Sequence, residues 1–185
     1  VRQGKPLGLG HAVLQARAVV GDNPFAALLP DVIVNPYASD YNNQNLAFML
    51  NQFNTDHHSQ ILVDPVADSD ISKYGIAKLE AAQKIQKTDD NQSYPVNGFV
   101  EKPKLEDAPS NLAVVGRYVF TPQIFDYLAK TEPSVGGEIQ LTDAIDALIS
   151  TQGVDVVTMV GNSFDAGDMS SYMQAFCYFA EKLAQ

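Results

Sequence analysis

Two acidic segments of the chain stand where a magnesium ion could be held. Asp31 follows the continuous apolar run 25–29, which is typical of a strand buried on both faces, and Asp165 follows a predicted strand near the C-terminus. In an open α/β sheet, ligands and metals are held at the carboxyl ends of strands, so we expect the two carboxylates to converge on one edge. Such hard oxygen ligands suit Mg²⁺. From the residues alone, a turn or helix-cap aspartate remains an alternative for each.

A charged pair follows another predicted strand, 96–100. Glu101 and Lys102 come just before Pro103, which stops regular strand pairing. Lys102 could neutralise a phosphate, and Glu101 could accept hydrogen bonds from sugar hydroxyls. Because adjacent residues on a strand point to opposite faces, the backbone must bend here if both act on one ligand. A solvated charged loop is the alternative.

Glycines near the N-terminus and a histidine pair are weaker signals. The segment 7–10 (LGLG) lets backbone amides come close to a nucleotide base, since glycine has no Cβ, but it is not a complete phosphate-binding fingerprint. His57 and His58 are neighbours on a helix, so their side chains diverge, and no cysteine or third histidine is nearby. We interpret them as a surface helix end.

The composition restricts the possible partners. The 185 residues, 45% of them hydrophobic, suit one substantial core, and we interpret residues 1–185 as one partial domain. A formal net charge of -10 argues against nucleic-acid and anionic-membrane surfaces, which call for clustered Lys and Arg. No apolar run approaches a membrane span, no leader precedes Val1, and the single Cys177 is expected to be a buried free thiol. These features predict a cytoplasmic protein.

The elements that must position these residues alternate along the chain. Helical apolar spacing occurs at 11–18, 46–53, 123–128, 138–150 and 172–183, and strand-like runs occur at 25–29, 60–63, 75–79, 96–100, 111–120 and 154–160. This alternation predicts an α/β fold with helices on both faces of a sheet. We expect a small mixed β subdomain around a flexible excursion at 84–93, and a packed final helix.

Taken in order, these segments resemble the bacterial UTP:glucose-1-phosphate uridylyltransferases, which are sugar-1-phosphate nucleotidylyltransferases. The resemblance rests on Gln3 and on the segments 6–14 (PLGLGHAVL), 29–31 (LPD), 74–75 (YG), 100–104 (VEKPK), 110–118 (SNLAVVGRY), 137–145 (GEIQLTDAI) and 164–168 (FDAGD). It implies a Rossmann-like nucleotidyltransferase sheet. The family's first strand and turn, with the signature G-x-G-T-R-x-L-P, do not occur in the chain. The sheet would therefore lack its N-terminal strands, and something upstream is expected to be absent.

The resemblance also implies a reaction, in which UTP and glucose 1-phosphate give UDP-glucose and pyrophosphate. The sugar phosphate attacks the α-phosphorus in line, so positioning and charge neutralisation supply most of the catalysis. By the family's motifs, Asp31 and Asp165 would hold Mg²⁺, and Lys102 would bind phosphate oxygens. Lys102 and Asp31 are the implied catalytic residues.

Other residues are implied to recognise the substrate. By the same motifs, Gln3 and the backbone at Gly8 would read uracil. Glu101 and Glu138 would contact glucose hydroxyls, and the backbone at Gly75 would lie close to the sugar. The family commonly forms homo-oligomers, and the exposed part of the last helix could serve such contacts.

The chain departs from the family near its C-terminus. Where the family reads F-D-x-G-x-K-x-G-Y, Met169 replaces the lysine and Ser171 replaces the second glycine. A phosphate-side cation would be lost. If these 185 residues are the whole molecule, the missing segment predicts little or no turnover. Two alternatives remain open: a non-catalytic or regulatory paralogue that binds sugar nucleotide or a catalytic homologue, and a related thymidylyltransferase acting on glucose 1-phosphate.

Overall fold

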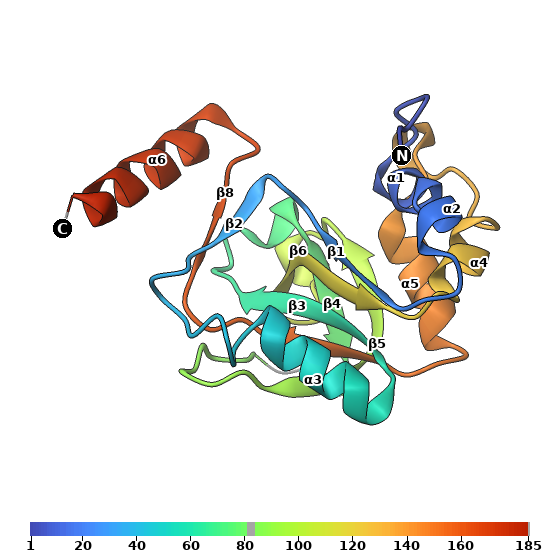
Figure 1. Ribbon diagram of the computed structural model, residues 1–185, viewed down its shortest axis with the longest axis horizontal. Coiled ribbons are helices and arrows are strands. Elements are labelled where there is room, and N and C mark those ends of the chain that lie inside the picture. Colours follow the sequence, from blue (N-terminus) through green and yellow to red (C-terminus); the bar gives the residue numbers. More distant parts are fainter. Residues whose placement is uncertain (81–83, 185) are drawn as a thin grey trace.

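The core of the computed structural model is one mixed β-sheet with helices packed around it (Figure 1). The structure describes residues 1–80 and 84–184. The α-helices are α1 (Leu9–Gln15), α2 (Arg17–Val20), α3 (Leu46–Asp56), α4 (Ile124–Leu128), α5 (Leu141–Ile149) and α6 (Met169–Leu183). The strands are β1 (Phe25–Leu28), β2 (Val32–Val34), β3 (Ser59–Pro65), β4 (Gly75–Leu79), β5 (Ser93–Glu101), β6 (Leu112–Phe120), β7 (Val154–Thr158) and β8 (Ser163–Asp165). The 3₁₀ turns are η1 (Ile71–Lys73), η2 (Leu105–Asp107) and η3 (Val135–Gly137).

The main sheet closes on itself. Its strand order is β1-β6-β3-β7-β5-β4, and β4 also pairs with β6 through Ile76 and Ala113. Strands β6, β3, β7, β5 and β4 therefore form a mixed five-stranded barrel, in which β3 and β7 are parallel and the other pairs antiparallel. The sequence predicted a Rossmann-like sheet with a small mixed β subdomain, whereas the described strands form this closed barrel. The long strand β5 pairs with β7 at its start and with β4 further along, which joins both parts into one sheet.

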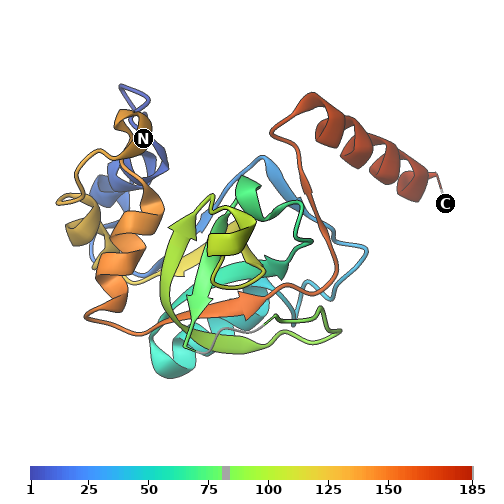
Figure 2. The same cartoon turned by 180° about the vertical axis from the view of Figure 1, so that it is seen from behind.

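Helices lie on both sides of these strands, so the predicted α/β class is confirmed. In β3, Ile61 and Val63 pack into the cluster that α4 and α5 complete, whereas Leu62 points the opposite way, toward α3. This division follows from the two-residue period of a strand. Seen from behind, α1, α4 and α5 stand together at one end of the sheet (Figure 2).

Strand β1 differs from its prediction as a strand buried on both faces. It lies at the end of the strand order and pairs only with β6 among the described strands. Phe25 and Ala27 are partly buried, while Ala26 and Leu28 are exposed. The run is apolar throughout, but the described fold covers only one of its faces.

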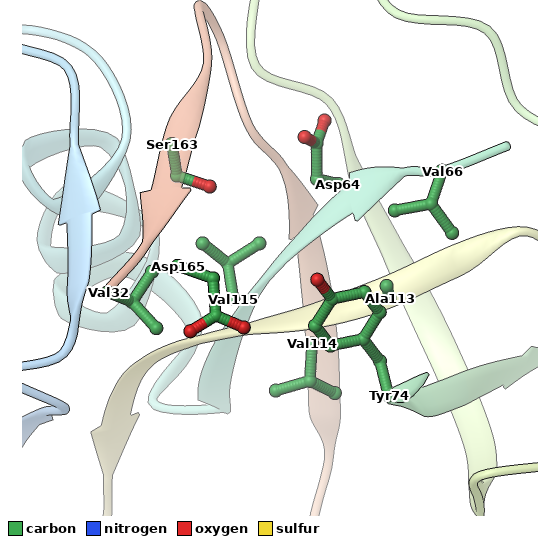
Figure 3. Close-up of a pocket in the computed structure, with 9 residues that line it drawn as sticks. All are labelled: Val32, Asp64, Val66, Tyr74, Ala113, Val114, Val115, Ser163 and Asp165. Carbon is green, nitrogen blue, oxygen red and sulfur yellow. The ribbon is translucent and has the colours of Figure 1, made fainter. Parts of the chain in front are cut away.

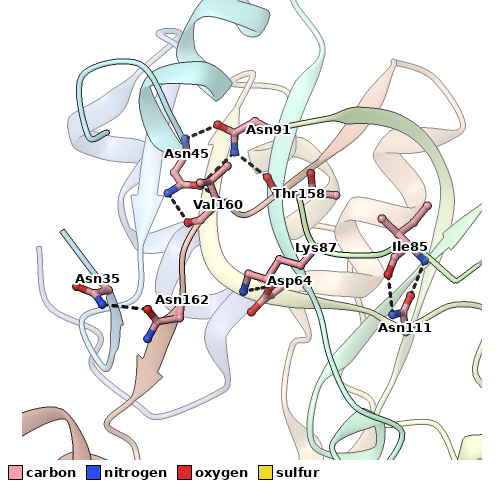
Figure 4. A network of polar contacts seen from close by, with 10 residues as sticks. All are labelled: Asn35, Asn45, Asp64, Ile85, Lys87, Asn91, Asn111, Thr158, Val160 and Asn162. Carbon is pink, nitrogen blue, oxygen red and sulfur yellow. Dashed lines mark hydrogen bonds and ion pairs between the residues drawn. The ribbon is translucent and has the colours of Figure 1, made fainter. Parts of the chain in front are cut away.

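The segment 84–92 has no regular secondary structure, yet side chains tie it to the barrel (Figure 4). Lys87 Nζ lies 2.7 Å from Asp64 Oδ1. Asn91 Nδ2 donates to the Thr158 carbonyl at 2.7 Å, and its Oδ1 accepts from the Asn45 amide at 2.9 Å. The flexible excursion at 84–93 stays a prediction.

Helix α6 leaves the body of the molecule, as both views show (Figures 1 and 2). Its Ala175 is buried, but Phe176 is 59% exposed and Cys177 is also exposed. The expectations of a packed final helix and a buried thiol are therefore wrong, because few described residues cover this helix. No helix among the described residues is long and apolar enough to cross a membrane.

Candidate active site

A cavity of about 360 Å³ opens beside the end of β1, between the barrel and the start of α5. It gathers residues from segments far apart in the sequence. Its lining is Leu9, Leu29, Asp31, Val32, Lys73, Tyr74, Gly75, Glu101, Lys102, Val114, Gly116, Tyr118, Gln140, Leu141, Thr142 and Asp165. Five of the eight residues predicted for the site are therefore on its wall.

The two predicted metal ligands come together through the pairing of β2 with β8. Val32 stands opposite Asp165 in this pair, and the Ala166 amide donates to the Asp31 carbonyl at 2.7 Å. A Cβ added at Gly167 would lie 3.0 Å from Asp165 Oδ1 and 3.8 Å from Asp31 Oδ2. Both carboxylates thus lie beside the same point at the cavity, where they offer hard oxygen donors.

Glu101 and Lys102 reach the same cavity because the backbone turns sharply between them. Lys102 has a φ of 45°, in the left-handed region that non-glycine residues seldom adopt. Its amide donates to the Tyr74 carbonyl at 3.1 Å, which holds the turn. Lys102 Nζ is 3.9 Å from Glu101 Oε1, and its side chain is 64% exposed. The backbone thus bends here, as it must if both side chains act on one ligand.

Gly75 lies opposite Glu101 in the pairing of β4 with β5 and also lines the cavity. A Cβ at this position would lie 3.1 Å from Glu101 Oε2. A contact that short would push the carboxylate aside. A glycine here therefore leaves room for the Glu101 side chain.

The remaining three predicted residues lie next to the cavity but do not line it. Gly8 packs against the segment before α5, where its added Cβ would be 2.8 Å from Glu138 Cβ. Gln3 Nε2 donates to the Gly8 carbonyl at 3.1 Å and contacts His11 Nδ1 at 2.8 Å. The side-chain amide of Gln140, which does line the cavity, donates to Glu138 Oε2 at 3.5 Å. These residues form a rim above the cavity.

Sequence reasoning missed a second cavity of about 160 Å³ (Figure 3), which shares Val32, Tyr74, Val114 and Asp165 with the first. Asp64, near the end of β3, lines it, and burial raises the pKa of this carboxyl despite the nearby Lys87. Burial, then the charge of Asp165, raises the pKa of Tyr74. The strand-end argument used for Asp31 would have found Asp64 if it had been applied to β3.

Arg117 also lacked a sequence signal, although it supports the turn that carries Asp31. Its guanidinium donates to the carbonyl of Leu29 at 2.9 Å and to that of Gly116 at 3.1 Å, and it also donates to the carbonyl of Val32. Desolvation lowers the pKa of Arg117, and the charge of Asp31 opposes that shift. The fork geometry of arginine suits this multiple contact.

Asp146 of α5 supports the strand that leads to Glu101. Its Oδ1 accepts a hydrogen bond from the Phe99 amide at 2.8 Å. Desolvation of the carboxyl raises its pKa to about 6, and the nearby Asp143 adds to the increase. The side chain is on an exposed position of the helix, so solvent moderates this effect.

The residues that depart from the family motif sit at the start of α6. Asp168 caps the helix: its Oδ1 accepts from the Ser171 amide at 3.0 Å and its Oδ2 from the Ser171 hydroxyl at 2.7 Å. Hydrogen bonds from Ser171 lower the pKa of Asp168. Met169 is 76% exposed and is outside the cavity lining. Ser171 therefore has a structural explanation as part of a helix cap.

Comparison with known proteins identifies relatives of the chain. The chain is 48% identical over 188 residues to the UTP–glucose-1-phosphate uridylyltransferase of Haemophilus influenzae, with 100% of this chain and 62% of the relative covered. A UTP-bound UGPase from Acinetobacter baumannii has a TM-score of 0.83 and 41% identity, covering 97% of this chain and 58% of that one. A UDP-glucose pyrophosphorylase complexed with UDP-glucose has a TM-score of 0.83 and 34% identity, covering 98% of this chain and 65% of that one.

These matches confirm the resemblance drawn from the motifs. The chain spans roughly three fifths of the length of these relatives, between 58% and 65%. The model of the nucleotidyl transferase family matches residues 1–182. Because this match covers nearly all of its residues, the chain belongs to the nucleotidyl transferase family.

Proposed function

We propose that the chain is part of an enzyme that transfers a uridylyl group from UTP to glucose 1-phosphate, giving UDP-glucose and pyrophosphate. The observation that carries the proposal is the meeting of Asp31, Gly75, Glu101, Lys102 and Asp165 at one cavity. These residues come from separate segments, and each has the chemistry that a metal, phosphate or sugar group requires. Relatives with uridylyltransferase names support the choice of substrates.

Asp31 and Asp165 would hold a Mg²⁺ ion, which when bound supplies positive charge to the phosphates of the substrate. The residues fit this ion because both are carboxylates beside one point. One oxygen of Asp165 accepts from the Gly167 amide at 3.0 Å, which orients the carboxylate. Among the described residues, no ion pair engages Asp31 or Asp165, so their charge is available to a metal.

The other residues would position the two substrates. Lys102 would neutralise phosphate oxygens, which its exposed ammonium can reach. Glu101 would accept hydrogen bonds from glucose hydroxyls, and the absence of a side chain at Gly75 would let the sugar approach it. Gln3 and the Gly8 backbone would read uracil from the rim, and Glu138 would add a sugar contact.

Ligand binding provides the first test. UDP-glucose titrated into the purified protein with Mg²⁺ should bind, and Asp165→Asn should weaken binding at least about tenfold, as expected for loss of a metal ligand. Asp168→Asn is the matched control, because it changes a carboxylate three residues away that caps α6, and asparagine caps a helix well. Equal binding by the two variants would contradict the assignment.

The substrate range is tested by pyrophosphate release from UTP and dTTP with glucose 1-phosphate. A preference for dTTP would replace the proposal with the thymidylyltransferase alternative. Met169→Lys addresses the non-catalytic alternative, which the replacement of the family's lysine by Met169 favours. If the family's lysine supplies a needed cation, this substitution should raise the turnover of the full-length protein, and an unchanged rate would contradict that role.

We also infer that the protein forms a homo-oligomer through α6. Ile33, Tyr172, Phe176, Phe179 and Leu183 are among the residues that line a groove of about 440 Å³ on this helix. A second copy would cover this apolar surface, which solvent otherwise contacts. Sedimentation velocity should therefore show a smaller species for Phe176→Asp than for the unsubstituted protein.

A further inference from the structure

Three side chains with metal-binding groups meet at the far end of β3 from the active-site cavity. Asp56 ends α3, His58 comes directly before β3, and Asp155 lies near the start of β7. One ligand atom from each lies within 4.8 Å of the other two. His58 Nδ1 is 3.0 Å from Asp155 Oδ2, and Asp56 Oδ1 accepts from the His58 amide at 2.8 Å. The connection from α3 to β3 and the distant strand β7 thus present one imidazole and two carboxylates to each other.

The side chain of Gln60 supplies a second observation at the same place. It is fully buried, and its Nε2 donates to the His58 carbonyl at 3.2 Å and to Asp155 Oδ2 at 3.5 Å. Its Oε1 is buried and has no hydrogen-bond partner among the described residues. Buried polar atoms are nearly always satisfied, so this oxygen needs a donor that the described side chains do not supply.

The imidazole is held in place by the absence of a side chain at Gly153. A Cβ at this position would lie 2.3 Å from both Cε1 and Nε2 of His58, so the ring rests directly on the glycine backbone. The Gly153 carbonyl in turn accepts from the Ser59 amide at 3.2 Å. This packing fixes the ring before any ligand arrives, which reduces the entropy lost on binding.

We propose that Asp56, His58 and Asp155 bind a divalent transition-metal ion of the Zn²⁺ type, at a site separate from that of Mg²⁺. An imidazole nitrogen with carboxylate oxygens suits zinc, whereas magnesium prefers oxygen ligands alone. The ion would neutralise the two carboxylates and tie α3 to β3 and β7.

The position of the cluster indicates a structural role for the ion. Strands β3 and β7 are parallel, and the cluster lies at their amino ends. Ligands in α/β sheets bind at the carboxyl ends, where Asp64 lines the second cavity. The sequence interpretation of His57 and His58 as a surface helix end treated the two as neighbours. The partner that matters, Asp155, lies 97 residues beyond His58.

The direct test is calorimetric titration of Zn²⁺ into the metal-free protein. We expect one tightly bound equivalent, with His58→Ala and Asp155→Asn each weakening it at least about tenfold. His57→Asn is the matched control: it removes the adjacent imidazole at a residue with a φ of 60°, which asparagine tolerates. Equal losses in His57→Asn and His58→Ala, or no Zn²⁺ binding by the unsubstituted protein, would overturn the proposal.

Two further measurements cover the case in which a ligand variant does not fold. X-ray absorption of the unsubstituted protein with one equivalent of Zn²⁺ should show an imidazole ligand together with oxygens, and a spectrum without imidazole would overturn the assignment. The Asp165→Asn variant should retain the binding. Loss of Zn²⁺ binding in this variant would indicate that zinc binds in the active-site cavity, and it would refute a separate site.

Discussion

Replacement of Arg117 by methionine tests whether the turn carrying Asp31 depends on a side chain from β6. The guanidinium donates to the carbonyls of Leu29, Gly116 and Val32, so one side chain joins the end of β1, the start of β2 and its own strand. Methionine keeps much of the aliphatic length but donates no hydrogen bond. The change thus removes these contacts with little loss of packing.

The expected cost follows from these hydrogen bonds. A hydrogen bond to a charged group contributes about 1.5–3 kcal/mol, and three of them would give an upper limit. Arg117 is only partly buried, so water can reach some of the carbonyls that lose their donor. We therefore expect the free energy of unfolding to fall by about 2 kcal/mol for Arg117→Met. For a domain of this size, the melting temperature should fall by about 4–8 °C.

Urea denaturation followed by circular dichroism measures this change, with Arg17→Met as the matched control. Arg17 forms an ion pair with Asp126 at 2.8 Å, but the two side chains are 51% and 56% exposed. Such a surface pair contributes about 0–1 kcal/mol. The loss in the free energy of unfolding for Arg117→Lys should fall between those for Arg117→Met and Arg17→Met. Lysine keeps the charge but lacks the planar guanidinium that donates to several carbonyls at once.

The outcome for UDP-glucose binding separates a local from a general effect. If Arg117 holds the turn, Arg117→Met should also weaken Mg²⁺-dependent binding, since Asp31 loses its fixed position. A free-energy loss no larger than that of Arg17→Met would refute the reasoning. So would unchanged Mg²⁺-dependent binding in a destabilised Arg117→Met protein.

Three other substitutions probe separate features of the fold. Because the pKa of Asp146 is raised to about 6, the native state binds a proton at a higher pH than the unfolded chain does. This group therefore increases the free energy of unfolding as the pH falls through 6. Asp146→Asn should remove this gain in stability at low pH, which melting temperatures at about pH 4.5 and 7 would measure. The same change in melting temperature between the two pH values for Asp146→Asn and the unsubstituted protein would contradict the raised pKa. Gly8→Ala places a Cβ 2.8 Å from Glu138 Cβ at a φ of 96°, whereas Gly21→Ala, at a φ of 62°, places its Cβ in open space. Chemical denaturation should therefore show a larger loss in the free energy of unfolding for Gly8→Ala, by about 1–3 kcal/mol. Equal losses in the two variants would exclude the steric cause. Asn45→Ala should lower the free energy of unfolding by about 2–4 kcal/mol in the same assay, because the buried side chain donates to the carbonyl of Val160 and accepts from its amide (Figure 4). A loss below about 1 kcal/mol would show that water replaces the side chain.

Much of the site could be predicted from local sequence. Asp31 follows an apolar strand, and Lys102 precedes a proline at the end of another, so their places at strand ends are visible in the order of residues. The alternation of side chains along a strand also showed that the backbone must bend between Glu101 and Lys102 if both act on one ligand. These features depend on a few neighbouring residues, because the period of a strand fixes the direction in which each side chain points.

Contacts between distant segments decided the rest. The barrel closes through Ile76 and Ala113, which lie far apart in the sequence, and no local pattern specifies that pairing. The apolar run of β1 has the same sequence pattern whether other elements cover one face of the strand or both. The partnership of His58 with Asp155 has the same origin, since it arises when β3 and β7 align in parallel.

The sequence by itself determined which residue types stand at the ends of which elements, because helix and strand periods act over a few residues. Only the tertiary structure decided which ends meet, which faces stay exposed and where Arg117 reaches. The physical reason is that long-range pairing depends on the packing of whole elements, and this sums many weak contacts that no short segment contains.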